Sequence, residues 1–403
     1  MALTSWNIGN REVIVSHKYD AITVSLTEQE LVSYDLEGRY LGSYDHGSNI
    51  RRGLDNTFQL RWREKLAENT RLCHQLLSDE EARQHYENLR LRVAQIQEDP
   101  QAGRAFPETL AIIERATNTT YAQLDESAKE FSRLYGHIPI LPPDQYRALV
   151  AQATDGCTYN QCSFCTLYRD KTFRVRSPED FQAHIQDVLK FLGRGLSYRK
   201  SVFLGDANAI ALATDKLEKL FAVLRDIPEL QTIIEKGGIH AFLDIYTGAR
   251  KEVSEYRILK DLGLQRVSLG VESGSENLLE FVNKPGSQNE ILEVVHTLKE
   301  AGLAVVVILM VGLGGKTYQA EHLEHSVDLV KQLPMGRGDI IYLSQFMPKP
   351  GAPYLVEENQ AGISPMSDME IVVETQHWKS VLLKEMRAQG VKVSPYSFQR
   401  FLY

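Results

Sequence analysis

Between about residue 145 and residue 347 the sequence alternates between apolar, strand-like runs and amphipathic helical segments. Repeated strand–helix–strand units have right-handed crossovers and pair their strands in parallel. The predicted strands are rich in Val, Ile and Leu with little alternation, which is typical of strands covered on both faces. The six predicted strands are 146–154, 200–206, 238–247, 266–273, 304–312 and 339–347. The five helices between them are 177–195, 214–227, 251–263, 288–302 and 319–333.

This alternation favours either a partial β/α barrel or an open, doubly wound sheet. Polar and glycine-containing loops follow several strands, among them "GDAN" at 205–208, "VESGS" at 271–275 and "GLGG" at 312–315. Ligand sites gather at the carboxyl ends of the strands in both architectures. We therefore expect the functional site at this end of the sheet.

The two ends of the chain show different patterns. Residues 1–140 are predicted to form an α+β accessory region, with a β-hairpin at 30–47 followed by helices. A proline-rich stretch marks the boundary to the central region, 141–355. Residues 356–403 are predicted to hold one helix and an aromatic tail.

Composition limits the function classes. The 403 residues are 43% hydrophobic and 24% charged, as in an ordinary globular protein. The formal net charge of −8 argues against nucleic acid as the main partner. The longest apolar run is short and interrupted by glycine, and the first residues lack the pattern of a secretory signal. We predict a cytoplasmic protein without a membrane partner.

Three of the four cysteines lie within nine residues, in "DGCTYNQCSFCTLYRDK" at 155–171. Clustered cysteines in a cytoplasmic protein more often bind metal or do redox chemistry than form disulfides. Zinc structural sites and iron–sulfur clusters usually take four protein ligands. Here Cys157, Cys162 and Cys165 supply three, and Cys73 is distant in sequence. Either Cys73 or a histidine completes a zinc site, or one coordination position stays open for chemistry.

The cysteine loop resembles that of the radical S-adenosylmethionine (SAM) superfamily. It follows the first strand of a β/α array and has an aromatic residue, Phe164, just before its last cysteine. The commonest spacing in that superfamily is C-x3-C-x2-C, whereas this chain has C-x4-C-x2-C. The difference of one residue bears on the conformation of the loop.

The resemblance extends over about residues 145–355. "LGDANA" at 204–209 stands where the superfamily has a glycine-rich segment that contacts the methionine amino group. "LGVESGSENLLEFVNK" at 269–284 is similar to the fourth-strand segment of the subgroup that includes oxygen-independent coproporphyrinogen oxidases and methylthiotransferases. "ILMVGLGG" at 308–315 and "MPKPGAPY" at 347–354 are similar to its fifth and sixth strands.

The fold that the resemblance implies is α/β, a partial (β/α)6 barrel of radical SAM type with an N-terminal α+β extension and a C-terminal helical extension. The implied cofactors are one [4Fe–4S] cluster, held by Cys157, Cys162 and Cys165, and SAM, which binds the fourth iron. Reductive cleavage of SAM then gives a 5′-deoxyadenosyl radical that abstracts hydrogen from a substrate. A reductant such as flavodoxin or ferredoxin is the implied electron donor.

The resemblance also implies roles for residues at the strand ends. Phe164 offers a flat surface for adenine, and Glu272 suits the ribose hydroxyls because a carboxylate accepts two hydrogen bonds. Asp206 or Asn208 accepts a hydrogen bond from the SAM ammonium group, and the two alternatives stay open. The complete set of implied SAM contacts is Phe164, Gly205, Asp206, Asn208, Glu272, Ser273, Gly312 and Gly314.

Two function classes follow from these residues. The first is a radical SAM enzyme acting on a small-molecule or peptide substrate, with a single cluster, because only Cys73 remains for a second one. The second is a non-catalytic iron–sulfur or zinc-binding protein that uses the same cysteines. The strand-end motifs favour the enzyme, since a carrier has no use for them.

Other motifs carry weaker signals. The basic residues that follow the cysteine loop, among them Arg169 and Lys171, are interpreted either as contacts for the SAM carboxylate or an acidic substrate, or as a solvated face. "GLGGKT" at 312–317 lacks the first glycine of a phosphate-binding loop. In "EHLEH" at 321–325 the two histidines do not have zinc-protease spacing, and the segment is predicted to be an exposed helix face.

Overall fold

The computed structural model describes residues 2–9, 11–65, 70–246, 251–397 and 401–403. The contacts between residues divide the chain into two compact units. The N-terminal unit contains residues 1–138, 185–200 and the last residues of the chain. The barrel unit contains residues 139–184 and 201–399. In the described ranges no helix combines the length and the apolar character needed to cross a membrane.

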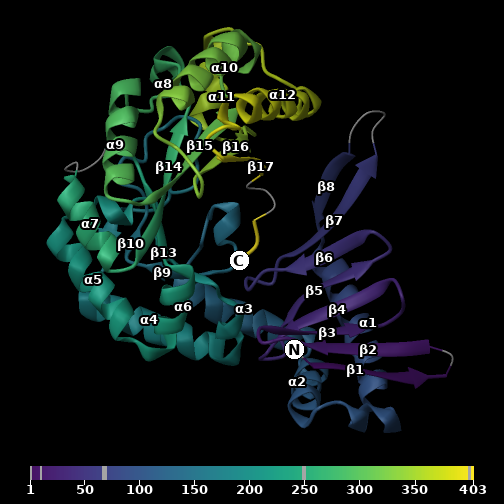
Figure 1. Cartoon of the computed structure of the whole chain (residues 1–403). Helices are drawn as coiled ribbons and strands as arrows, with labels where there is room; N and C mark the ends of the chain where they lie inside the picture. Colours follow the sequence, from purple (N-terminus) through teal and green to yellow (C-terminus); the bar gives the residue numbers. More distant parts are fainter. Residues whose placement is uncertain (1, 10, 66–69, 247–250, 398–400) are drawn as a thin grey trace. The chain divides into compact units, whose positions relative to one another are not determined.

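The sheet of the N-terminal unit is an antiparallel meander, in which each strand pairs with the next one along the chain (Figure 1). The predicted hairpin at 30–47 corresponds to β4 and β5, with "LEGR" as its turn. Six further strands join it, which were not predicted from the sequence. The strands are β1 (Ala2–Ile8), β2 (Arg11–His17), β3 (Ala21–Ser25), β4 (Glu30–Asp35), β5 (Tyr40–Asp45), β6 (Ser48–Arg52), β7 (Phe58–Lys65) and β8 (Thr70–Leu76).

Three helices follow the sheet: α1 (Asp79–Gln97), α2 (Pro107–Asn118) and α3 (Tyr121–Tyr135). Helix α1 begins with a capping box, in which Ser78 and Glu81 satisfy each other's backbone N–H groups. One hydrophobic core joins the sheet to the helices, with Trp6, Val24 and Phe58 from the strands and Ile112 from α2. The N-terminal unit therefore has a core of its own.

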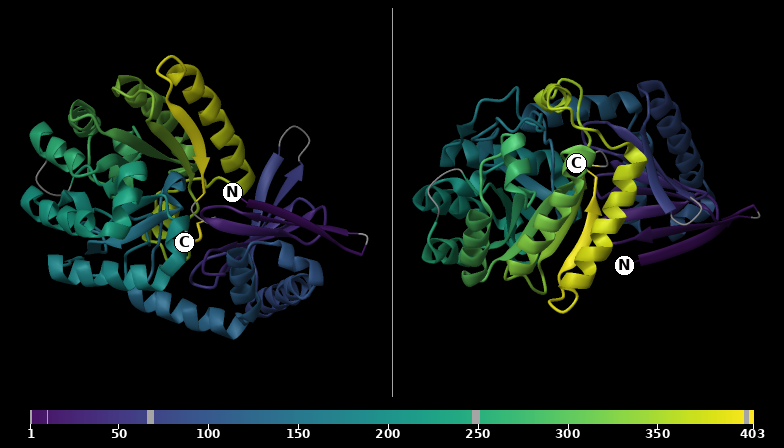
Figure 2. Two further views of the ribbon diagram at one scale, coloured as in Figure 1. Left: turned by 60° about the horizontal axis from the view of Figure 1, so that its bottom comes forward. Right: turned by 90° about the horizontal axis from the view of Figure 1, so that it is seen from above.

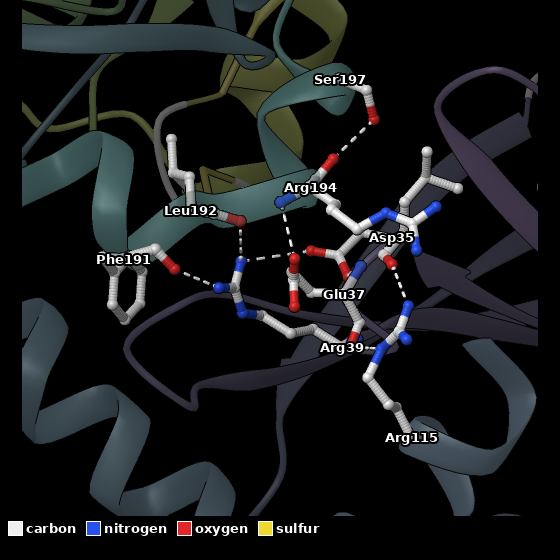
Figure 3. Close-up of polar contacts among 9 residues, drawn as sticks. Asp35, Glu37, Arg39, Arg115, Phe191, Leu192, Arg194 and Ser197 are labelled. Carbon is white, nitrogen blue, oxygen red and sulfur yellow. Dashed lines mark hydrogen bonds and ion pairs between the residues drawn. The ribbon is translucent and has the colours of Figure 1, made fainter. Parts of the chain in front are cut away.

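A segment from the middle of the chain completes this unit (Figure 3). Helix α4 (Pro178–Leu192) ends there and continues into the 3-10 helix η3 (Gly193–Tyr198). Arg39, in the turn between β4 and β5, donates to the last carbonyls of α4, those of Phe191 and Leu192 (3.2 Å to the latter). Glu37 accepts from the backbone N–H of Arg194 at 2.6 Å. The Arg39 cation at the C-terminus of α4 and the Glu37 carboxylate, which accepts from the backbone N–H of Arg194, thus hold the segment 191–197 in place.

The sheet of the barrel unit is parallel throughout, with the strand order β17-β16-β15-β14-β13-β12-β9. Its end strands do not pair with each other in the described residues, so the barrel is open. All six predicted strands are confirmed, as is the α/β fold class. They are β9 (Ala148–Gln152), β12 (Ser201–Gly205), β13 (Ile239–Leu243), β14 (Leu264–Glu272), β15 (Ala304–Val311) and β16 (Ile340–Gln345).

The helices of this unit run along the outer side of the sheet (Figures 1 and 2). Apolar residues on α5, α7 and α9 face the strands, which explains why both strand faces are apolar in sequence. The helices are α5 (Thr214–Asp226), α6 (Pro228–Gly237), α7 (Val253–Asp261), α8 (Glu276–Phe281), α9 (Gln288–Glu300), α10 (Gly315–Gln332), α11 (Pro353–Gln360) and α12 (Asp368–Met386).

The C-terminal region contains a seventh parallel strand, β17 (Lys392–Tyr396), where the sequence predicted an aromatic tail. Pro395 in this strand lacks an N–H donor, which made a strand improbable from sequence. The structure accommodates it because β17 is the edge strand, paired on one side only. Helix α12 lies beside β17 in the yellow part of Figure 2. The region is thus part of the sheet, in addition to the predicted helix.

Candidate functional site

The cysteine loop begins where β9 ends and is closed by a short antiparallel pair, β10 (Thr154–Asp155) and β11 (Arg174–Val175). At the end of the neighbouring strand β12, Asp206 is buried and accepts hydrogen bonds from the backbone N–H of Gly156 and from Lys171 Nζ, both at 3.3 Å. Burial raises the pKa of Asp206, although Lys171 and Gly156 oppose the rise. Asp206 thus joins the first and last parts of the loop to the sheet.

The three cysteines lie close enough to influence one another electrostatically. Cys162 is buried, whereas Cys157 and Cys165 are partly accessible. Burial raises the pKa of Cys162 to about 11, and Cys165 and Cys157 add to the rise. Between them, the backbone of Ser163 donates to Val282 O at 2.9 Å and accepts from the N–H of Tyr354 at 3.1 Å. The loop is therefore held by three separate parts of the chain.

Arg169 stabilises the loop from within. Its Nη2 donates to Cys162 O at 2.6 Å and its Nε donates to Cys165 O at 3.0 Å. Arg176 pairs with Asp155 at 3.5 Å, at the base of the loop. In this structure the basic residues after the cysteines contact the loop itself. Arg169 and Arg174 are exposed, which agrees with the interpretation as a solvated face, and the contact with SAM or an acidic substrate stays a prediction.

A buried ion pair stands beside the cysteines. Lys284 Nζ lies 3.7 Å from Glu272 Oε1, and the two side chains are 8% and 10% exposed. Burial lowers the pKa of Lys284, but the charges of Glu272 and Cys162 outweigh it, so that the pKa lies above its ordinary value. Lys284 therefore stays a cation. The second oxygen, Glu272 Oε2, is buried without a hydrogen-bond partner among the described residues.

Glu272 also has an unusual backbone. Its φ is +63°, in the left-handed region, and the N–H of Ser273 donates to Val271 O at 2.8 Å across it. A positive φ is unfavourable for a residue with a side chain, and such conformations cluster at functional sites. The hydroxyl of Ser273 contacts His322 of α10 and the N–H of Ser275. The hydroxyl of Ser273 is thus directed at protein groups, whereas Glu272 Oε2 has no partner among the described residues.

Asn208 has a different environment from Asp206. Its amide donates to Asp244 Oδ2 at 2.7 Å and to Thr158 Oγ1 at 3.2 Å, and its carbonyl accepts from the N–H of Asp244 at 3.0 Å. Asn208 therefore links the cysteine loop to the end of β13. The hydrogen bonds of both candidates for the SAM ammonium are already directed at protein groups, and the choice between them stays a prediction.

The remaining predicted contacts lie around the loop. Phe164 packs, partly buried, on an apolar cluster that includes Leu278 and Leu313. Gly312 and Gly314 have φ values of +90° and +77°, which favour glycine. A Cβ at Gly314 would lie 2.7 Å from Leu278 Cδ1, so close packing against protein also requires glycine there. Gly205 is the last residue of β12, next to Asp206.

Residues 152–330 match the family model described as the radical SAM superfamily. These residues form a radical SAM domain. The superfamily is one of enzymes, and its cofactors, a [4Fe–4S] cluster and SAM, are the cofactors of this domain. The predicted family and subgroup are confirmed.

Relatives of known name fall in the predicted subgroup. The heme chaperone HemW of Bacillus subtilis is 23% identical over 57% of this chain and 58% of its own length. The tRNA-2-methylthio-N(6)-dimethylallyladenosine synthase of Sulfurihydrogenibium sp. is 23% identical over 57% of this chain and 49% of its own. The chain thus spans about half the length of these curated relatives. Coproporphyrinogen III oxidase (HemN) from Escherichia coli has a similar solved structure, with a TM-score of 0.41, 17% identity, and coverage of 63% of this chain and 55% of its own.

The residues of this radical SAM domain fit both cofactors. Among the described residues no three His, Cys, Asp or Glu side chains are arranged to hold a single metal ion. A cluster does not require such convergence, since each cysteine binds an iron of its own. Three thiols leave one iron for an outside ligand. The unpartnered Glu272 Oε2 and the buried, unpartnered hydroxyl of Ser163 are free to bind hydroxyl or amino groups of that ligand.

We expect Asp206→Asn to loosen the cysteine loop. The substitution keeps the size of the side chain but removes the negative charge that lies 3.3 Å from Lys171 Nζ, whose side chain is 20% exposed. The free energy of unfolding in urea should fall by about 1–3 kcal/mol, and the cluster should be lost several times faster to an iron chelator.

The control for this substitution is Asp155→Asn, which removes the more exposed pair with Arg176 on the same loop. This substitution should lower the free energy of unfolding by less than about 1 kcal/mol, which is the usual contribution of a surface ion pair. Equal stability and equal cluster loss in the two variants would show that Asp206 does not hold the loop.

Lys284 is a site residue that sequence reasoning missed. It stands at the end of "EFVNK", within the segment that resembles the superfamily, but a lone lysine there has no distinctive pattern. It reaches Glu272 because helix α8 reverses the chain between them. His322 was also missed, because it was expected on an exposed face, whereas it is 2% exposed.

Proposed function

We propose that this chain is an enzyme that cleaves SAM reductively and uses the product to abstract hydrogen from a small-molecule or peptide substrate. The observation that carries the proposal is the buried Lys284–Glu272 pair beside three thiols, with one carboxylate oxygen left without a partner. A protein that only stores or carries a cluster has no need of a buried, half-satisfied carboxylate there, because such a group destabilises the fold.

Each residue has a role in this proposal. Cys157, Cys162 and Cys165 bind three irons as thiolates, which coordination to iron makes possible despite the raised pKa of Cys162. Glu272 Oε2 accepts hydrogen bonds from the ribose hydroxyls. Lys284 supplies the positive charge that attracts the carboxylate of SAM. When bound and reduced, the cluster supplies the electron for cleavage of SAM, and the protein positions the cofactors.

Further contacts to SAM are proposed for the loops around these residues. Phe164 provides an apolar surface, and Gly312 and Gly314 keep the loop after β15 close to the apolar cluster. Gly205 brings the end of β12 to Asp206. Asp206, Asn208 and Ser273 fix the backbone around them through the hydrogen bonds described above. We further propose an external one-electron reductant of the flavodoxin or ferredoxin kind.

The test is anaerobic reconstitution of the full chain with iron and sulfide, reduction with dithionite, and addition of SAM. We expect a cluster absorbance near one [4Fe–4S] per chain and formation of 5′-deoxyadenosine, measured by liquid chromatography with mass detection. Reaction without SAM is the blank. A protein that holds the cluster but neither binds nor cleaves SAM would refute the proposal and support a carrier role.

A further inference from the structure

The turn after β14 is clamped by two side chains of α10. His322 Nδ1 lies 2.8 Å from the hydroxyl of Ser273, and the hydroxyl of Ser326, one helical turn further on, accepts from the N–H of Gly274 at 2.9 Å. A Cβ at Gly274 would lie 2.3 Å from His325 O, so the turn touches the backbone of α10. The position of this turn is therefore fixed by its contacts with α10.

The protonation of His322 follows from its partners. His322 Nε2 lies 2.9 Å from the carbonyl oxygen of Met310, which can only accept, so Nε2 carries the proton. Burial lowers the pKa of His322 to about 4, which keeps the ring neutral. Nδ1 is then an acceptor, and it lies 2.8 Å from the hydroxyl of Ser273 and 3.3 Å from that of Ser326. The shorter contact is with Ser273, which donates its hydroxyl proton to Nδ1 while accepting from the N–H of Ser275 at 2.9 Å.

The ring itself is held firmly. It meets the indole of Trp378 of α12 edge to face, with ring centroids 4.6 Å apart. Trp378 is 1% exposed and donates to Glu374, which also accepts from Gln319 of α10. Through hydrogen bonds and one aromatic contact, His322 thus connects α10 with α12, the carbonyl of Met310 in β15 and the turn after β14.

Glu272 stands immediately before Ser273 in this turn. Its left-handed backbone persists only if the surrounding structure fixes it, and the fixing groups next to it are Ser273 and, through Ser273, His322. We infer that His322 is a positioning residue, which holds the turn so that the Glu272 carboxylate is aimed at SAM. This inference rests on the function proposed above and adds a residue outside the site to it.

The test compares His322→Leu with His322→Asn in reconstituted protein with an oxidised cluster. Leucine removes the contacts of the ring with Ser273, Ser326 and Met310, whereas the Asn carbonyl can still accept from Ser273. We expect the dissociation constant for SAM, measured by calorimetry, to rise at least about tenfold in His322→Leu. The Asn variant should recover most of the affinity. Iron content should stay unchanged in both, and with saturating SAM the rate of cleavage should fall much less than the affinity.

The matched control is His325→Leu, one turn along on the same helix and 43% exposed, which should bind SAM as the wild type does. Because His322→Leu could fail to fold, Ser273→Ala provides a second variant. It should weaken SAM binding similarly. The double variant should bind SAM no more weakly than either single variant, since both substitutions remove the hydrogen bond between Ser273 and His322.

A readout independent of SAM is the histidine tautomer, measured by nuclear magnetic resonance on protein labelled with ¹⁵N at histidine. The signal missing in His322→Asn should show a protonated Nε2 and a bare Nδ1 between pH 6 and 8. A charged ring, or wild-type SAM affinity in both His322→Leu and Ser273→Ala, overturns the positioning role alone. A wild-type protein that binds no SAM overturns the proposed function as well.

Discussion

Alanine at Cys157, Cys162 or Cys165 should each abolish 5′-deoxyadenosine formation, with a loss of at least about 10³-fold. In the proposed function each thiol supplies the protein ligand of a different iron, and the described structure holds no other cysteine in the barrel unit to take its place. The measurements are iron and sulfide per chain, the cluster absorbance, and 5′-deoxyadenosine formed per minute after reduction.

Cys73→Ala is the control for these variants. Cys73 belongs to β8 of the N-terminal unit, where its thiol donates to Glu64 at 3.4 Å. Iron content and SAM cleavage should be unchanged by its removal. Loss of iron in Cys73→Ala, or zinc in place of iron in the purified wild type, would instead favour a closed four-ligand site.

Lys284→Met should damage both stability and SAM binding. The substitution leaves the buried carboxylate of Glu272 without its counter-charge, which costs about 3–5 kcal/mol when a buried pair loses one partner. It also removes the cation proposed to attract the SAM carboxylate. We expect the dissociation constant for SAM to rise by a factor of about 100, together with a lower urea midpoint.

Two companion variants separate these effects. Lys299→Met breaks another ion pair of the same unit, in which the half-buried Lys299 Nζ lies 2.6 Å from Oδ2 of the buried Asp339. It should destabilise the protein but leave SAM affinity intact. The double variant Lys284→Met with Glu272→Gln should regain stability, because no buried charge is left alone, but not SAM binding. If Lys284→Met binds SAM normally, the lysine is structural only.

The barrel strands could be predicted from sequence because their residues are buried on both faces. Runs such as "AVVVILMV" in β15 are apolar throughout and are separated by amphipathic helices. Strands of the N-terminal sheet have one covered face, and their alternation is weak: in β1 only Trp6 is buried. The seventh barrel strand contains Pro395, which argues against a strand in the sequence alone. Its place at the edge of the sheet, where it pairs only with β16, explains why the proline is tolerated.

The parts of the site that lie close together in sequence could be predicted, whereas those formed by distant residues could not. The three cysteines stand on one loop, so their spacing alone indicated a metal site. The contacts of Asp206 with Gly156 and of Ser273 with His322 join residues about 50 positions apart, and no sequence pattern records them. The charge of Lys284 likewise gains its meaning only from the fold, which brings it to Glu272 and the thiols.

The path of the chain has a consequence for dividing this protein. Residues 185–200 interrupt the barrel sequence but belong to the N-terminal unit, where Arg39 and Glu37 bind the end of α4 and the start of η3. A truncated protein that starts at residue 139 would keep this segment but lose its hydrogen-bond partners, Arg39 and Glu37. The last carbonyl groups of α4 and the side chain of Leu192, which is buried in the full chain, would then be exposed to water. The barrel unit is therefore expected to be stable only together with the N-terminal unit, and the two should be expressed and purified as one chain.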